Sequence, residues 1–144
     1  MPIYDTDVCF AETRNSKKQP KLVICTCTAH GELRLYDPVS NVRPVSRMDI
    51  NKSKVLHKVA PWTQDSVVAV NQEGELLVCS LKSQFKLLHK LMGSQTGSQN
   101  GLLQFRQPEF GAYMLSVGLD RYLRVFSEQT RKEVGRLYLG NKLI

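Results

Sequence analysis

Residues 30–37 read HGELRLYD, and two later stretches follow the same pattern: EGELLVCS at 73–80 and DRYLRVFS at 120–127. Each begins with a turn dipeptide, continues with apolar residues at alternate positions, and ends in a small polar residue. The equivalent leucines, Leu33, Leu76 and Leu123, are 43 and 47 residues apart. Alternation with a period of two is typical of a β-strand, and recurrence on this scale indicates a repeated structural unit.

Further apolar stretches surround each of these segments. One precedes each turn, at 22–26, 67–70 and 113–117, and is rich in the Val, Ile, Leu and Tyr that strands prefer. Others lie at 7–10, 42–50, 56–62, 85–92, 102–105 and 134–139. Four short strands in roughly 40–45 residues is the blade of a WD-repeat β-propeller. The sequence therefore predicts an all-β chain of three four-stranded blades, at 5–50, 55–92 and 101–139, with residues 141–144 starting a next blade.

Three blades are too few to close a ring, because propellers have about 4–8 blades. An open stack leaves two apolar flanks without a neighbour. We therefore expect these 144 residues to be a piece of a longer protein, a truncated product or half of an assembly. We also expect the chain alone to be poorly soluble, since stacked repeats depend on their neighbours.

Two segments interrupt the apolar pattern. Residues 12–21 (ETRNSKKQPK) are polar and basic and contain a proline, which predicts an exposed loop. Residues 93–101 (GSQTGSQNG) predict a flexible connector between the second and third blades. The connector lacks the Lys-Ser/Thr ending of a phosphate-binding loop, so no nucleotide site is expected there.

Several residues occupy positions that WD repeats use for an internal hydrogen-bonded network. Asp120 lies in a turn, where its carboxylate can accept backbone hydrogen bonds. A hydroxyl precedes it by four residues and an aromatic follows by six. We expect a structural network under the blades, and not a ligand site, from these residues: Thr26, His30, Tyr36, Asp37, Ser116, Asp120 and Phe126.

Lysine and arginine number 20 against 13 acidic residues, which gives a net charge of +7 spread along the chain. Arg34 and Arg124 occupy the same position in two blades, where the second blade has Leu77, and we expect both arginines to be exposed. Such groups could contact phosphates or acidic protein patches, and the alternative is that they are simply solvated. The candidate binding surface comprises Arg34, Arg106, Arg121, Arg124, Arg131, Lys132 and Arg136.

Nothing in the sequence indicates catalysis or a bound cofactor. Paired carboxylates suited to acid–base work are absent, and no known local signature places a histidine beside a nucleophile. The cysteines lie in apolar runs without metal-ligand spacing, so we expect small buried core residues in a reducing compartment and no metal. The residues considered were His30, His57, His89, Cys9, Cys25, Cys27 and Cys79.

The apolar runs are far shorter than the ~20 residues that span a bilayer, and the acidic start does not resemble a signal peptide. We therefore expect a protein of the cytosol or nucleus, with neither a membrane nor a small-molecule substrate as partner.

Three stretches carry a family resemblance: KLVICTCTAHGELRLYDP at 21–38, GLDRYLRVF at 118–126, and GLLQF at 101–105 after its Gly/Ser connector. They resemble the later blades of the WD repeat-containing protein 74 family, nuclear and nucleolar factors that assemble the large ribosomal subunit. The resemblance spans about residues 5–144, and YDP at 36–38 and GLDR at 118–121 are its most specific parts. It implies a seven-bladed ring that docks on pre-60S particles and is released by an AAA-ATPase.

Two functions follow as hypotheses. The first is a non-catalytic scaffold in 60S subunit biogenesis and rRNA processing, which binds ribosomal proteins or rRNA. The second is a WD-repeat adaptor for another protein complex, such as a ubiquitin ligase. Salt distinguishes them, because RNA binding through phosphates weakens steeply with salt whereas an apolar peptide groove does not.

Overall fold

The computed structural model describes residues 5–14, 19–39, 43–52, 54–82, 86–93, 95 and 97–140. These residues form three four-stranded antiparallel sheets and no helix, so the predicted all-β class is confirmed. Residues 141–144, expected to start a next blade, lie outside the described residues. Sheet 1 contains β1 (Asp5–Arg14), β2 (Pro20–Thr28), β3 (Glu32–Tyr36) and β4 (Ser46–Asp49). Sheet 2 contains β5 (Leu56–Pro61), β6 (Ser66–Asn71), β7 (Leu76–Ser80) and β8 (Lys86–Leu91). Sheet 3 contains β9 (Gln99–Gln107), β10 (Gly111–Gly118), β11 (Tyr122–Ser127) and β12 (Glu133–Tyr138).

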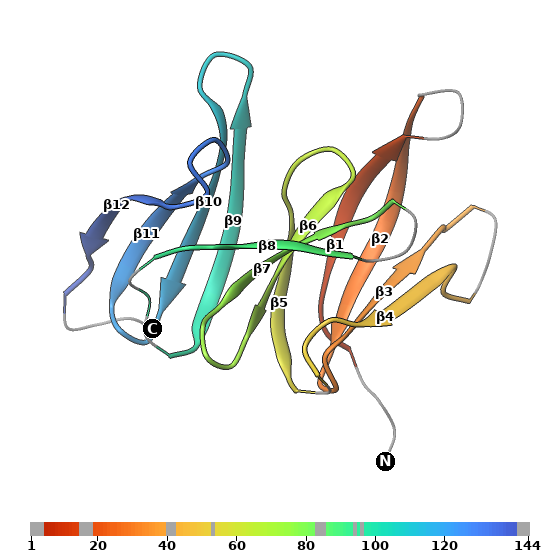
Figure 1. Ribbon diagram of the computed structural model, residues 1–144, viewed down its shortest axis with the longest axis horizontal. Helices are drawn as coiled ribbons and strands as arrows, with labels where there is room; N and C mark the ends of the chain where they lie inside the picture. The colour runs from red at the N-terminus through yellow and green to blue at the C-terminus, as the bar shows by residue number, and fades with distance from the viewer. Residues whose placement is uncertain are drawn as a thin grey trace.

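The three sheets stand side by side in chain order, and the first strand of each, β1, β5 and β9, lies at a shared inner edge (Figure 1). Two side chains of β1 bond to the backbone of β5. Thr6 Oγ1 donates to the carbonyl oxygen of Leu56 at 2.5 Å, and Asp7 Oδ2 accepts from the backbone N–H of Val59 at 3.0 Å. Since these bonds cross from one sheet to the next, they fix the spacing of sheets 1 and 2 at the inner edge.

Sheet 2 is covered on both faces, and its sequence shows why. Every residue of β6 is buried. Successive side chains of a strand point to opposite faces, so Val67 and Ala69 pack toward sheet 1, while Val68 and Val70 pack toward sheet 3. A continuous apolar run of this kind is typical of a strand buried on both sides. Each sheet has a preceding face, which looks toward the sheet before it in the chain, and a following face on the other side. In sheet 1 the following face packs on sheet 2, and the preceding face is the opposite one.

Two apolar cores result, one in each gap between sheets. The core between sheets 1 and 2 is built from small and medium side chains, including three of the four cysteines. The core between sheets 2 and 3 contains the larger side chains Trp62, Leu76, Leu91, Met114 and Phe126. The expectation that the cysteines are buried in the core is confirmed for Cys25, Cys27 and Cys79, whereas Cys9 is half-buried.

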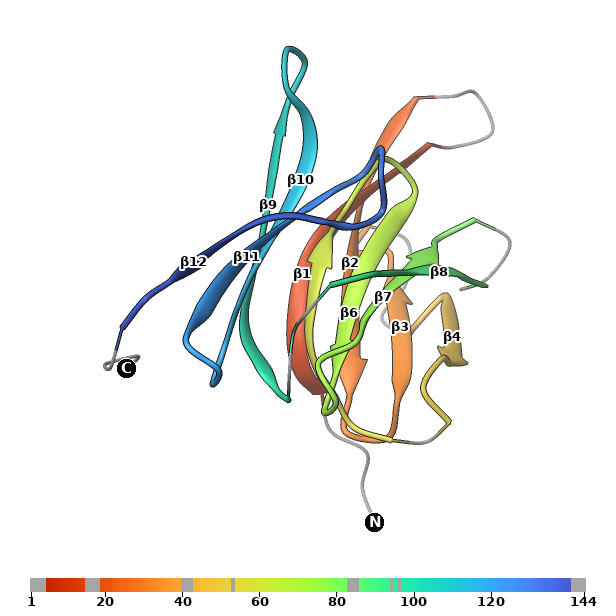
Figure 2. The ribbon, with the colours of Figure 1, turned by 60° about the vertical axis from the view of Figure 1, so that its left-hand side comes forward.

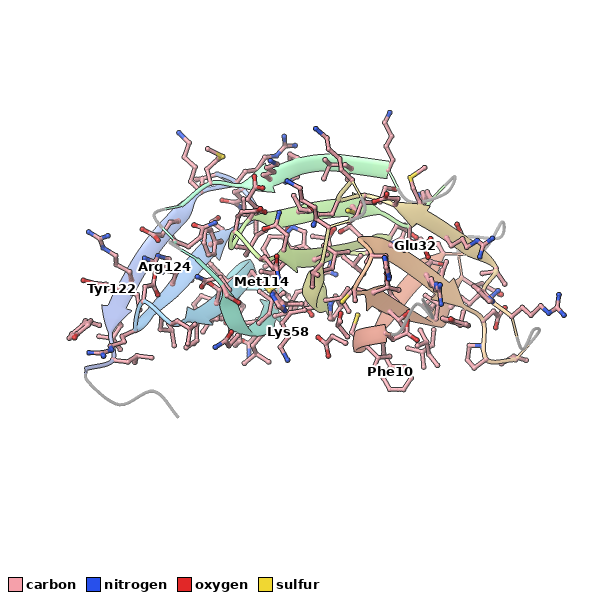
Figure 3. All side chains as sticks on the ribbon, turned by 90° about the horizontal axis from the view of Figure 1, so that it is seen from below. Phe10, Glu32, Lys58, Met114, Tyr122 and Arg124 are labelled. Carbon is pink, nitrogen blue, oxygen red and sulfur yellow. The ribbon has the colours of Figure 1, made fainter. Side chains whose placement is uncertain are left out.

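Both ends of the stack leave apolar surface uncovered, as expected for three sheets that do not close a ring. On sheet 1 the preceding face exposes Val8, Phe10 and Leu22. In Figure 3, Phe10 points away from the rest of the chain. On sheet 3 the following face forms a hollow lined by Leu103, Phe105, Phe110, Tyr113, Leu115 and Val125. Figure 2 shows that none of the described strands lies against the outer side of sheet 3.

The hairpin turn before the third strand of each sheet requires a positive φ at one position. Gly31 and Gly74 fill that position in sheets 1 and 2, with φ of 81° and 85°. In sheet 3 the equivalent residue is Arg121, with φ of 69°. A residue with a Cβ is unfavourable in this region, so glycine is its usual occupant.

Two predicted loops are partly strand. Residues 12–14 continue β1 and residues 20–21 begin β2, with Glu12, Thr13 and Arg14 opposite Leu22, Lys21 and Pro20, while residues 15–18 lie outside the described residues. The prediction of a loop over all of 12–21 is wrong because backbone pairing continues past the buried part of the sheet, whatever the polarity of the side chains. The predicted connector 93–101 is also shorter, since β9 begins at Gln99.

Candidate functional site

The basic residues of the predicted surface do not form one patch. In sheet 3, Arg121 and Arg136 lie toward the β10–β11 turn. Arg106, Arg131 and Lys132 lie toward the opposite end, where the β9–β10 and β11–β12 hairpins meet. All five are exposed. Sheet 3 therefore presents two separate basic areas.

Arg124 differs from the prediction, because it is only 2% exposed. It lies on the preceding face of β11, in line with Phe126 of the apolar core. Its Nη1 lies 2.5 Å from Asp120 Oδ2, and its Nε lies 2.9 Å from Glu133 Oε1. A buried guanidinium is tolerated when carboxylates pair with it and satisfy its donors. The expectation of an exposed Arg124 is wrong, and the residue instead joins the β10–β11 turn to β12.

The residue equivalent to Arg124 has a different environment in each of the other two sheets. In sheet 2 it is Leu77, which packs into the core against sheet 1. In sheet 1 it is Arg34, whose Nε donates to Glu32 Oε2 at 3.1 Å and whose side chain is 16% exposed. Burial lowers the pKa of Arg34, but hydrogen bonds with Tyr36 and Glu32 outweigh it and raise that pKa. Arg34 is therefore half-buried and paired, and does not extend into solvent as predicted.

A cluster of two tyrosines and two arginines lies on the preceding face of β11 and β12. Tyr122 pairs with Tyr138, and Arg124 with Arg136, so all four side chains share one face. The Tyr122 and Tyr138 ring centroids are 5.3 Å apart with the planes tilted by 53°. The guanidinium carbons of Arg124 and Arg136 lie 5.2 and 5.6 Å from the Tyr122 centroid, within cation–π range. Figure 3 shows Tyr122 beside Arg124 at the outer end of the stack.

The sequence singled out both arginines and missed both tyrosines. The alternation Tyr122, Arg124 and Arg136, Tyr138 was the available signal, since residues two apart on a strand share a face. It could be used only once the pairing of β11 with β12 was known, because a shift of one residue would separate the two pairs.

The predicted network in sheet 3 forms with different partners. Asp120 Oδ1 accepts from the backbone N–H of Tyr122 at 3.3 Å, and the second carboxylate oxygen binds Arg124. Among the described residues, the buried Ser116 Oγ has no hydrogen-bond partner, so Ser116 does not belong to a network with Asp120. Phe126 is fully buried and packs in the apolar core. Arg124 has taken the place that the expected hydroxyl would fill beside Asp120.

In sheet 1 the expected network is likewise rearranged. Thr26 Oγ1 donates to Asp5 Oδ1 at 2.8 Å. His30 lies in the turn, where its backbone N–H donates to Thr28 Oγ1 at 3.2 Å. The threonines therefore anchor β1 and the β2–β3 turn, whereas the sequence grouped Thr26 with the His30 side chain.

The remaining two predicted positions of sheet 1 lie at the other end of β3. Tyr36 hydrogen-bonds to Arg34. Asp37 is buried, with Oδ2 2.5 Å from Lys21 Nζ and Oδ1 accepting from the backbone N–H of Val39 at 3.1 Å. Asp37 therefore holds the end of the β2–β3 hairpin, which is a structural role.

The cysteine thiols of the core have raised pKa values, which makes them poorly reactive. Burial raises the pKa of Cys79 to about 12 and that of Cys27 to about 11. A hydrogen bond with Cys9 and burial raise the pKa of Cys25 well above its ordinary value. Neutral thiols are poor nucleophiles and poor metal ligands. Within the described residues, no three His, Cys, Asp or Glu side chains are grouped to hold a metal ion, and no helix is long and apolar enough to cross a membrane.

Comparison with known proteins gives a consistent set of relatives. No family model matches the chain. It is 27% identical over 164 aligned residues to the ribosome biogenesis protein NSA1 of Meyerozyma guilliermondii, covering 99% of this chain and 39% of the relative. It is 30% identical over 145 residues to human WD repeat-containing protein 74, covering 99% of this chain and 34% of the relative. The chain is thus a distant homologue of these proteins over nearly its whole length, and spans little more than a third of theirs.

Solved structures support the fold. The WD40 β-propeller domain of Doa1 matches with a TM-score of 0.63 at 15% identity, covering 82% of this chain and 37% of the domain. A chain of an active polycomb repressive complex 2 in the basal state matches with the same score and identity, covering 84% of this chain and 25% of its own length. The predicted likeness to WD-repeat propellers is confirmed.

Proposed function

We propose that this chain is a non-catalytic scaffold in the assembly of the large ribosomal subunit, where it binds pre-60S particles and supports rRNA processing in the nucleolus. The observation that carries the proposal is the similarity over 99% of the chain to a protein named for ribosome biogenesis. In this proposal the three sheets are successive blades, with the boundaries 5–50, 55–92 and 101–139. Further blades complete the ring.

The charge distribution supports a partner that carries phosphates. A net charge of +7 attracts nucleic acid, and the exposed basic residues of sheet 3 offer two areas for contact. These proposed contact residues are Arg106, Arg121, Arg131, Lys132 and Arg136. Arg34 and Arg124 are left out because the Arg34 side chain is half-buried and Arg124 is buried, whereas the five contact residues are exposed.

The scaffold role also agrees with the chemistry of the described residues. The buried thiols of Cys27 and Cys79 have raised pKa values, which keeps them neutral and poorly nucleophilic. By analogy with the family, pre-60S proteins and rRNA are the partners, and an AAA-ATPase releases the factor from the particle.

The test is affinity purification of the endogenously tagged protein, with and without RNase, followed by mass spectrometry. Enrichment of large-subunit precursor proteins and of an AAA-ATPase supports the proposal, and their loss after RNase places RNA in the contact. Recovery of an unrelated complex without pre-ribosomal material contradicts it. Such a result favours the adaptor alternative, for which a ubiquitin ligase is one candidate partner.

A further inference from the structure

The Tyr122–Tyr138 pair, with Arg136 beside it and Arg121 in the adjoining turn, is a preorganised aromatic surface at one end of sheet 3. Tyr122 is held from the inside by Arg124, which two carboxylates fix in place. Tyr138 is packed against Tyr122 and remains 53% exposed. The backbone N–H of Leu139 donates to the carbonyl oxygen of Arg121 at 2.8 Å, which ties the end of β12 to the turn. The exposed ring and the Arg121 backbone are therefore held together.

This surface lies on the opposite side of sheet 3 from the uncovered apolar face. Tyr122, Tyr138 and Arg136 share the preceding face with Phe126, whereas Leu115, Leu123 and Val125 belong to the following face. A further sheet packed on the following face would leave the tyrosine pair accessible. The lack of a neighbouring sheet on the following face therefore does not explain why the Tyr138 ring is exposed.

Arg121 has an unfavourable backbone conformation in the turn beside the tyrosine pair, as Lys52, Asp65 and Arg131 have elsewhere. Its φ of 69° places it in a backbone region that sheets 1 and 2 assign to glycine at the same turn position. A side chain there costs roughly 1 kcal/mol of stability. Strained residues persist where the surrounding structure holds them in place, and they cluster at functional sites.

We propose that Tyr138, supported by Tyr122, stacks an unpaired base of single-stranded RNA, with Arg136 and Arg121 binding the adjacent phosphates. The inference rests on the proposed function, because it assigns the RNA contact of the same scaffold. Aromatic rings recognise RNA by stacking on bases that are splayed out of a helix, and neighbouring arginines add phosphate and cation–π contacts. A duplex hides its base faces, so the platform selects single strands.

The test measures fluorescence anisotropy of labelled 12-nucleotide single-stranded and double-stranded RNA with the full chain. Tyr138→Ala is expected to weaken single-strand binding about tenfold, because base–aromatic stacking contributes this much. Tyr138→Phe keeps the ring and should retain the affinity. Phe10→Ala is the matched control, since Phe10 is a 63% exposed aromatic on sheet 1 and should leave binding unchanged.

Arg121→Gly gives a second readout that separates binding from folding. Glycine relieves the backbone strain, which offsets the loss of the Arg121 side-chain contacts, so the melting temperature should not fall. RNA affinity should fall, and the slope of log K against log salt should decrease in magnitude by about 0.7 for one lost phosphate contact to a single strand. Loss of a merely structural residue would instead lower the melting temperature.

Three outcomes would overturn the inference. They are equal affinity for duplex and single strand, equal effects of Tyr138→Ala and Phe10→Ala, or binding of a poly-glutamate peptide in preference to RNA. If purified particles still contain pre-ribosomal material while Tyr138→Ala binds RNA normally, the stacking platform is refuted and the scaffold function survives. If no pre-ribosomal material is recovered, the function itself has failed.

Discussion

Replacing Arg124 with leucine tests whether the ion-pair network of sheet 3 is a structural element. Leucine is the residue that sheet 2 has at the equivalent position 77, so its shape suits the strand. The substitution removes the cation from Asp120 and Glu133, whose side chains are only 12% and 18% exposed. Removing one partner of a buried ion pair costs about 3–5 kcal/mol, and the residual exposure of the carboxylates places Arg124→Leu near about 3 kcal/mol. For a chain of this size that corresponds to a melting temperature lower by about 10 °C.

The assay is urea unfolding followed by circular dichroism and by the fluorescence of Trp62, the single tryptophan, which is buried between sheets 2 and 3. The cost arises from two carboxylates left without their cation, so neutralising them should restore stability. A triple variant that adds Asp120→Asn and Glu133→Gln is expected to recover at least half of the loss, since the amide oxygen of the introduced asparagine can still accept from the Tyr122 backbone. A loss below about 1 kcal/mol for Arg124→Leu, the size of an exposed pair, would contradict the structural role of the ion pairs. So would a triple variant no more stable than the single one.

Three further predictions concern the core, the thiols and the turns. Phe126→Ala should lower the free energy of unfolding by about 3–5 kcal/mol in the same urea assay, because Phe126 is fully buried. Phe10→Ala should lower it by well under about 1 kcal/mol, because Phe10 is exposed. Similar losses for the two variants would contradict the assigned core. Burial raises the pKa of Cys79 from 9.0 to about 12, so folding favours its neutral thiol. This stabilisation is complete below pH 9 and disappears as pH rises toward 12, and urea unfolding across that range should show the decline. The same decline in a Cys79→Ala variant would show that another group causes it. Gly74→Ala should destabilise more than Gly111→Ala in thermal melts, because both have positive φ but only at Gly74 would a Cβ overlap the Gly97 carbonyl; equal shifts would show that backbone strain alone matters.

The fold could be predicted from the sequence because two of its features depend directly on how a strand is built. These features are the repeat spacing of Leu33, Leu76 and Leu123 and the apolar run from Val67 to Val70. Both depend on local alternation and on whether one or two faces are covered. The order of strands in each sheet follows, since consecutive strands joined by short turns pair with each other.

The candidate site was predicted only in part, and the reason is physical. Arg34 and Arg124 occupy the same repeat position, yet their surroundings are set by neighbouring residues: Glu32 and Tyr36 for one, Asp120 and Glu133 for the other. The local sequence pattern does not predict which of the two arginines is buried.

The tyrosine pair and the turn strain were missed for related reasons. Tyr122 and Tyr138 meet only through the register of two strands, which a bulge in the β11–β12 pairing shifts by one residue at Val134. Arg121 adopts a conformation that is usually taken by glycine, so no glycine marks this turn position in the sequence. Sites that depart from local rules are those where tertiary context or function has overridden them.

Sedimentation of the endogenously tagged protein through a sucrose gradient shows whether the protein is part of ribosomal precursor particles. The scaffold account predicts that the protein peaks with precursors of the large ribosomal subunit, and that RNase or high salt moves it to light fractions. If the protein stays in light fractions at low salt, or travels with a complex that lacks ribosomal precursors and resists salt and RNase, the account is contradicted.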